Sequence, residues 1–149
     1  MAYDDPVRET YIQVSSAFGA TTESQQFMGP KGKTGRVVDI DVYITASMVG
    51  TTTVPEICVG TASADATYAR FRLGTAAGTG YAATAPRRAT VVGGFTLQDG
   101  TPAFEDFTGH VKLRTAVIPA DTAFFISRVA GTGGSPAGTG SSRVIIEWT

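Results

Sequence analysis

Two aspartates separated by one residue are the side chains of this sequence best placed for chemistry. Asp39 and Asp41 lie in the segment 36–45, where apolar and polar residues alternate. On a β-strand they share one face at a separation of roughly 7 Å. Paired carboxylates can bind a cation or hydrolyse a glycosidic bond. Aspartates that alternate along an exposed strand face are more often solvated groups that prevent edge pairing, and this interpretation is favoured.

The chain contains one histidine and one cysteine. A Ser-His-Asp triad would have to be built around His110, yet the sequence has no Gly-x-Ser-x-Gly elbow to present the serine. One cysteine and one histidine do not supply a closed zinc site. Cys58 lies in the apolar run Ile57-Cys58-Val59, which predicts a buried and unreactive thiol. We therefore expect no enzyme activity and no catalytic, cofactor-binding or metal-binding residues.

Two glycine-containing segments resemble nucleotide-binding loops only in part. Gly32-Lys33-Thr34 matches the end of a P-loop, but Phe27 occupies the position of its first glycine and a strand follows where a helix is needed. The run Gly131–Gly140 precedes a strand near the C-terminus, outside any βαβ unit. The first segment instead predicts a solvated turn whose basic patch contacts an acidic partner subunit, formed by Lys31, Lys33 and Arg36.

These side chains must be positioned by β-structure, because no long stretch has helical spacing. In the segment 36–45, Val38, Ile40, Val42 and Ile44 fall on one face, which is the clearest strand signal in the chain. The predicted strands are Thr10–Phe18, Arg36–Thr45, Pro55–Gly60, Tyr68–Leu73, Thr90–Leu97, His110–Ile118, Ala123–Val129 and Arg143–Trp148. About eight strands predict an all-β, antiparallel β-sandwich, jelly-roll-like, with long Gly-rich loops. The loops are expected at 19–35, 74–80 and 131–142, and the last strand closes the core through Val144, Ile146 and Trp148.

Length and composition bound the domain organisation. The 149 residues predict a single sandwich domain over 10–149, preceded by an exposed N-terminal arm over 1–9 that is polar and contains Pro6. Charged residues make up 17 % of the chain, below the usual quarter, which suits packing against other subunits. The net charge of −1 predicts no nucleic-acid or membrane partner. No apolar run approaches the ~20 residues of a membrane span, and no signal peptide is recognised, so synthesis in the cytoplasm is expected.

The order of these segments is similar to that of a known class of proteins. The segments that carry the similarity are Gly35–Val42, Ile57–Ala62, Ile118–Thr122, Val129–Gly140 and the final apolar strand. This layout, over roughly residues 35–149, resembles the small virion proteins of tailed bacteriophages that decorate or cement the capsid. The resemblance implies a structural protein on the capsid surface, a homotrimer at three-fold positions that binds the major capsid protein. It implies no small-molecule substrate and no cofactor.

Two sets of charged residues are candidate partner contacts. The acidic residues Asp4, Asp5 and Glu9 are expected to order on a neighbouring subunit, and the basic patch forms the second set. The first alternative function is a carbohydrate-binding or host-attachment module of a phage head fibre or tail component. It would require an exposed aromatic platform from Tyr11, Tyr43, Tyr68 and Tyr81, for which core or interface packing is the favoured interpretation. A tail or connector component and a small hydrolase built on His110 are two further candidate functions.

Overall fold

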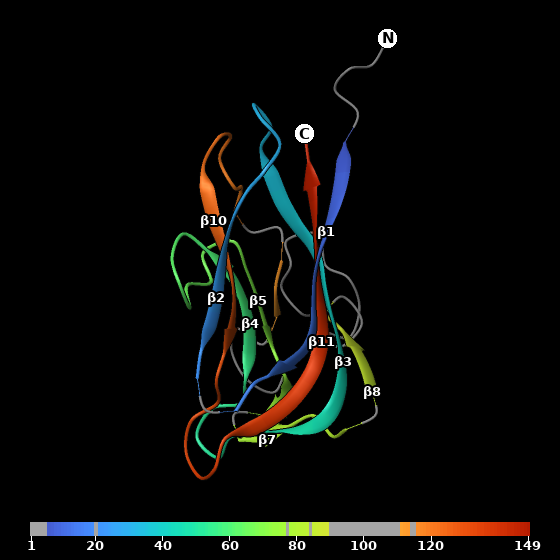
Figure 1. Cartoon of the computed structure of the whole chain (residues 1–149), viewed down its shortest axis with the longest axis vertical. Helices are drawn as coiled ribbons and strands as arrows, with labels where there is room; N and C mark the ends of the chain where they lie inside the picture. The colour runs from blue at the N-terminus through green and yellow to red at the C-terminus, as the bar shows by residue number, and fades with distance from the viewer. Residues whose placement is uncertain (1–5, 20, 77, 84, 90–110, 114–115) are drawn as a thin grey trace.

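The computed structural model describes residues 6–19, 21–76, 78–83, 85–89, 111–113 and 116–149. Two antiparallel β-sheets pack face to face (Figure 1). The strands are β1 (Val7–Ala17), β2 (Glu23–Met28), β3 (Gly35–Val49), β4 (Glu56–Gly60), β5 (Ala69–Arg72), β6 (Gly74–Ala76), β7 (Thr79–Gly80), β8 (Ala85–Arg88), β9 (Val111–Lys112), β10 (Ala123–Val129) and β11 (Ala137–Trp148). The predicted all-β antiparallel sandwich is confirmed.

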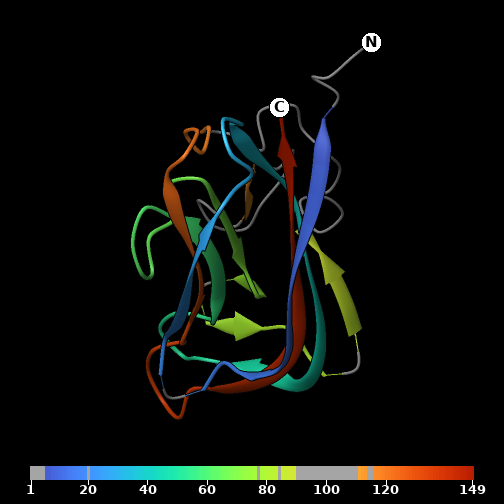
Figure 2. The same ribbon diagram turned by 45° about the horizontal axis from the view of Figure 1, so that its top comes forward.

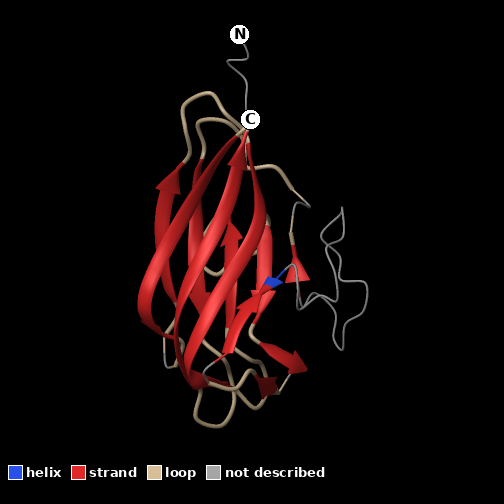
Figure 3. Cartoon of the chain, turned by 90° about the vertical axis from the view of Figure 1, so that its right-hand side faces the viewer, coloured by secondary structure: helices blue, strands red, loops and turns tan. Residues whose placement is uncertain are grey.

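The chain passes repeatedly from one sheet to the other. The four-stranded sheet has the order β1-β11-β3-β8, and the five-stranded sheet has the order β2-β10-β4-β5-β9. Turning the molecule separates the two layers and shows β3 and β11 curling at their lower ends (Figure 2). The long strands run side by side along the length of the molecule (Figure 3). Because neighbouring strands of the four-stranded sheet are distant in sequence, residues from both ends of the chain meet on this sheet.

The hydrophobic core lies between the two sheets. The predicted inward face of the last strand is confirmed, since Val144, Ile146 and Trp148 are at most 1 % exposed. The ring centroid of Trp148 lies 5.8 Å from that of Phe124 on the opposite sheet. Cys58 is also fully buried, as predicted. Burial of this apolar surface is the main term that stabilises the sandwich.

The inward face of β3 differs from the predicted one at its start. Val37, predicted on the outer face, joins the core cluster with Ile40. The β11 partners of Val37 and Asp39 are consecutive residues, so Val38 is an additional residue in a β-bulge. The bulge shifts the alternation by one position, which a strict period of two cannot indicate.

Several predicted boundaries are wrong because strands continue into segments expected to be irregular. β1 begins at Val7, so Val7, Arg8 and Glu9, which were predicted to belong to the arm over 1–9, are paired in the sheet. β2 lies inside the predicted loop 19–35, and the small hairpin of β6 and β7 occupies the predicted loop 74–80. β11 begins at Ala137, inside the predicted loop 131–142. Pairing with strands already in place extends these segments despite their weak sequence patterns.

Two further differences and one untested prediction concern the middle of the chain. The short strand β8 has no counterpart among the predicted strands. The predicted strand Thr90–Leu97 lies outside the described residues. Within the predicted strand His110–Ile118, the described residues form only β9 and a bridge from Ile118 to Gly35, and His110 itself is outside the described part of the chain.

Candidate functional site

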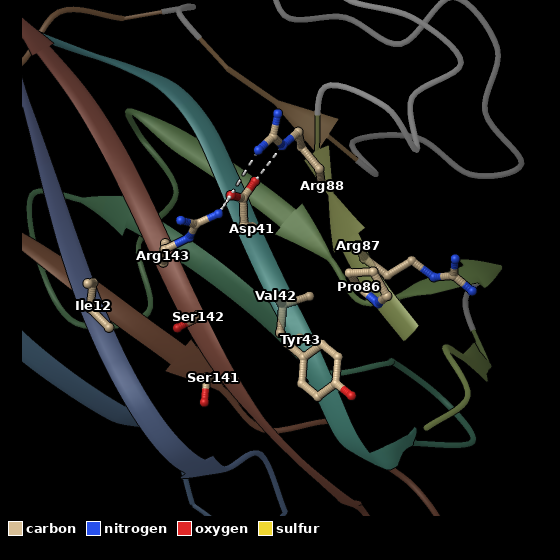
Figure 4. A pocket seen from close by; sticks show the side chains of 10 residues that line it. All are labelled: Ile12, Asp41, Val42, Tyr43, Pro86, Arg87, Arg88, Ser141, Ser142 and Arg143. Atoms are coloured by element: carbon tan, nitrogen blue, oxygen red, sulfur yellow. Dashed lines mark hydrogen bonds and ion pairs between the residues drawn. The ribbon is translucent and has the colours of Figure 1, made fainter. Parts of the chain in front are cut away.

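The outer face of the four-stranded sheet contains a hollow of about 590 Å³ (Figure 4). Its lining combines apolar and charged side chains from all four strands. The residues that matter for its chemistry are Ile12, Tyr43 and Pro86, which are apolar or aromatic, and Asp41, Arg88 and Arg143, which are charged. We refer to this feature as the outer hollow.

The strand register places four of these residues in one row across the sheet. Ile12 on β1 pairs with Arg143 on β11, and Arg143 pairs with Asp41 on β3. Asp41 in turn pairs with Arg88 on β8. Side chains of directly paired residues lie on the same face of a sheet and contact one another. The row therefore brings an exposed apolar residue beside an Arg–Asp–Arg group.

Asp41 is shared by the two arginines of this row. Its Oδ2 accepts a hydrogen bond of 2.5 Å from Nη2 of Arg143, and its Oδ1 accepts one of 3.0 Å from Nε of Arg88. Arg88 Nε also lies 3.2 Å from Oδ2 of Asp39. The pKa of Arg88 is raised, first by the hydrogen bond to Asp41 and then by the negative charges of Asp41 and Asp39. The group is thus a network of ion pairs that joins three strands.

The two aspartates do not face water as predicted. Asp39 and Asp41 are each only 8 % exposed, whereas the side chains of Arg88 and Arg143 are 51 % exposed. The long arginines cover the short carboxylates and satisfy them, which accounts for this burial. The sequence pattern indicated the shared face of the aspartates but not the cationic partners, because those partners come from distant strands.

The arrangement does not favour acid–base or metal chemistry. The guanidinium groups already neutralise the carboxylates that a cation would need. Within the described residues, no group of three or more His, Cys, Asp or Glu side chains is placed to hold a metal ion. The thiol of Cys58 donates a hydrogen bond of 3.3 Å to Glu56, and burial raises the pKa of this thiol, which keeps it in the unreactive form.

The apolar part of the outer hollow is exposed. Ile12 is 61 % exposed and Tyr43 is 51 % exposed. By contrast, Tyr68 and Tyr81 are buried, and Tyr11 packs edge-on against Phe27 with ring centroids 4.8 Å apart. The four tyrosines considered for a sugar-binding platform are therefore not on one surface. Tyr43 alone among them presents half of its surface to solvent.

The predicted basic patch is divided between a turn and a strand. Lys31 is exposed and Lys33 is half-buried in the turn before β3, while Arg36 is exposed on β3 itself. In that turn Gly32 has a positive φ of 72°, and its amide donates a hydrogen bond of 2.9 Å to Asp121. Arg36 pairs in register with Glu147, which forms an ion pair of 3.0 Å with Arg8. The structure thus contains the predicted turn at Lys31 and Lys33. Contact of Lys31, Lys33 and Arg36 with a partner subunit stays a prediction.

The predicted acidic contacts also separate into two groups. Glu9 lies on β1, where its carboxylate accepts a hydrogen bond of 2.5 Å from the Tyr11 hydroxyl. This bond gives Glu9 a role within the domain. Asp4 and Asp5 lie outside the described residues.

The sequence pattern did not predict the outer hollow. The only local signal for it was the position of Tyr43 two residues after Asp41 on one strand face.

Comparison with known proteins identifies no family for this chain. No known protein family matches its sequence, and no curated protein matches it either. Among solved structures, it is similar to a chain described as "Acidic stable capsid structure of Helicobacter pylori bacteriophage KHP30". The two are 11 % identical, the alignment covers 95 % of this chain and 93 % of the other, and the TM-score is 0.32. No property of that chain is transferred to the present protein on this basis.

In the part of the present protein that the structure describes, no helix has the length and apolar character to cross a membrane.

Proposed function

We propose that this chain is a structural virion protein of a tailed bacteriophage that decorates the capsid and binds the major capsid protein. The antiparallel sandwich, the low charge content of 17 % and the order of turn and strand segments all support this proposal. Such a role needs no catalytic group. It requires surfaces that form many weak contacts, which the symmetry of a shell then repeats.

The outer hollow is the observation that carries the proposal. It presents Ile12 and Tyr43 to solvent around the half-exposed arginines Arg88 and Arg143. Tyrosine and arginine dominate the energetic centres of protein–protein interfaces, where both bury large areas and still form hydrogen bonds. The carboxylates beneath are already paired, so a partner can cover them without leaving a buried charge unsatisfied.

Purified particles of the virus that encodes the chain provide the first test. We expect mass spectrometry to detect the protein in gradient-purified virions, and electron microscopy to place it on the outer surface of the head. Density for it in the tail would favour a tail or connector component. Its absence from virions would contradict a structural role altogether.

Co-sedimentation with shells assembled from the major capsid protein provides the second test. We expect the double variant Ile12→Ser, Tyr43→Ser to bind the shells at least about tenfold more weakly, which corresponds to about 1.4 kcal/mol. Met28→Ser is the matched control, because Met28 is 61 % exposed on β2 of the other sheet. Equal loss in both variants would show that the outer hollow has no special part in attachment.

Glycan binding is the second candidate function, and one observation favours it. The exposed ring of Tyr43 beside two guanidinium groups is suited to an acidic sugar, since rings stack on sugars and arginine binds carboxylates. A glycan array probed with the protein and with Tyr43→Ala tests this candidate. Selective signal that disappears in the variant would support it over protein contact.

A further inference from the structure

We propose that the outer hollow of each copy binds the N-terminal segment Met1–Pro6 of a neighbouring copy. This inference rests on the proposed structural function and names the partner of the same site. It predicts self-association by exchange of arms, with the arm of one copy held by the arginines and apolar residues of the next.

The first argument is chemical complementarity. The segment reads Met1-Ala2-Tyr3-Asp4-Asp5-Pro6, so one aromatic ring precedes two carboxylates and a proline. The outer hollow offers matching groups, with Ile12, Tyr43 and Pro86 for the ring and Arg88 and Arg143 for the carboxylates. Aromatic rings pack well against such residues, and arginine binds carboxylates through paired hydrogen bonds.

The second argument is the unused hydrogen-bonding capacity of the arginines at the site. Arg88 and Arg143 face the nearby carboxylates of Asp41 and Asp39, so the charges within the site balance. The guanidinium of Arg87 does not add to them, because it lies over the buried ring of Tyr81, 4.9 Å from its centroid. Each guanidinium has five N–H donors, more than its contacts with these carboxylates use. An acidic segment is therefore the favoured occupant.

The third argument is reach, which assigns the arm to a different copy. β1 begins at Val7, and Ile12 lies five residues further along it, a distance of roughly 17 Å. Asp41 lies two strands away from β1, which adds roughly 10 Å across the sheet. Asp5 is two residues before Val7 and can extend only about 7 Å from it. The carboxylates of a copy's own N-terminal segment thus cannot reach Arg88 and Arg143, the arginines paired with Asp41 of the same copy.

An arm bound by the next copy is a head-to-tail contact. Such contacts close into rings when the rotation between copies permits. A ring of three copies would produce the homotrimer implied by the sequence resemblance. The same exchange would make each subunit hold its neighbour, so that attachment to a shell becomes multivalent.

Cysteine cross-linking between two full-length variants tests the exchange directly. One protein carries Ala2→Cys and a C-terminal tag, and the other, untagged, carries Ser141→Cys, next to Tyr43 in the hollow, so both aromatic rings stay in place. They are mixed at about 100 μM and oxidised with copper phenanthroline, and the mixed dimer is quantified on a non-reducing gel. Met28→Cys replaces Ser141→Cys in the control, and the native Cys58 is fully buried in the fold. Melting curves establish that each variant is folded.

We expect at least a fivefold higher yield of mixed dimer with Ser141→Cys than with Met28→Cys. Adding Arg143→Gln to the Ser141→Cys protein should lower that yield, whereas Arg8→Gln, outside the hollow on the same sheet, should leave it unchanged. Equal yields for positions 141 and 28 would overturn the proposal. If the yields are equal and the double variant Ile12→Ser, Tyr43→Ser still loses shell binding, the outer hollow binds the major capsid protein and not the N-terminal segment. A cross-linked protein that is absent from virions would contradict the proposed function but support the arm exchange.

Discussion

At the scale of single residues, the most informative side chain is Asp41. It accepts hydrogen bonds from Arg143 on β11 and Arg88 on β8, so one carboxylate links three neighbouring strands of the sheet. Both arginines stay half-exposed, which allows them to be rehydrated when the carboxylate is lost. Asp41 is therefore expected to contribute to stability without being essential for folding.

Replacing this carboxylate by an amide of the same shape tests its contribution. We expect Asp41→Asn to lower the free energy of unfolding by about 1–2 kcal/mol, because the two arginines lose their negatively charged partner and one acceptor oxygen is lost. Urea denaturation monitored by tryptophan fluorescence measures the change. Glu147→Gln is the control, since its partner Arg8 is largely exposed and such pairs contribute less than about 1 kcal/mol. Equal effects in the two variants would contradict the special position of Asp41.

At the scale of elements, the end of β11 depends on the start of β3. The indole of Trp148 packs directly on the backbone of Gly35, the residue with which it is paired. A Cβ atom at position 35 would lie 2.5 Å from Cζ3 of this ring, well inside van der Waals contact. The absence of a side chain at Gly35 thus allows the largest core residue to be buried.

Adding a methyl group at this position should displace the indole. We expect Gly35→Ala to lower the free energy of unfolding by about 1–3 kcal/mol, the usual effect of overpacking a core. The adjacent exposed substitution Arg36→Ala should change it by less than about 0.5 kcal/mol. Urea denaturation curves of both variants provide the measurement, and an unchanged midpoint for Gly35→Ala would show that the ring has room to move.

The loop between β4 and β5 is organised around another aspartate. Asp65 Oδ2 accepts hydrogen bonds from the Thr67 hydroxyl at 2.6 Å and from the amide and hydroxyl of Thr61 at 2.7 and 2.9 Å. These bonds, that of Thr67 foremost, lower the pKa of Asp65 from 3.8 to about 2. A lowered pKa in the folded state stabilises the fold above pH 3.8, and this stabilisation is lost as the pH falls through about 2.

The pH dependence of stability tests this account of the loop. At neutral pH we expect Asp65→Asn to be less stable than the unsubstituted protein. The difference should narrow as the pH falls from about 4 through about 2, because the aspartate is already protonated in the unfolded state and becomes protonated in the folded state over this range. Urea midpoints measured at intervals between pH 7 and pH 2 provide the readout. A stability difference between the two proteins that stays constant over this pH range would contradict the lowered pKa of Asp65 in the folded state.

At the scale of the whole molecule, the sandwich includes the first residues of β1, which begins at Val7. Val7 pairs in register with Trp148, and Glu9 accepts the hydrogen bond from Tyr11. The pKa of Tyr11 is raised by burial and then by Glu9, which agrees with a tyrosine held at the edge of the core. Residues 7–9 thus belong to the folded domain, although their polar sequence predicts an arm.

Two truncations distinguish the arm from the domain. We expect deletion of residues 1–6 to leave the melting temperature within about 2 °C and to weaken attachment to capsid shells. Deletion of residues 1–9 should in addition lower the melting temperature by about 3–6 °C, since it removes three paired residues of β1. Calorimetry and shell co-sedimentation of the two proteins measure these effects. Unchanged shell binding after the shorter deletion would contradict a role of the arm.

The sequence alone determined the fold class and the segments with a clean pattern. Alternating apolar residues identified the strand at 36–45, and apolar runs identified the strand 123–129 and the inward face of Val144, Ile146 and Trp148. These signals are local, because side chains on one strand face repeat every second residue. β2 escaped prediction because residues 23–26, exposed at the edge of a sheet, are all polar. The bulge at Val38 escaped because pairing with β11 creates it.

The outer hollow was decided by the tertiary structure alone. Its central row joins Ile12, Arg143, Asp41 and Arg88, which are far apart in sequence and meet only through the register of four strands. Register depends on which strands pair and on where bulges fall, and both depend on how the two sheets bury their inner faces. The sequence therefore indicated that Asp39 and Asp41 share a face, while the paired strands determined that arginines cover them.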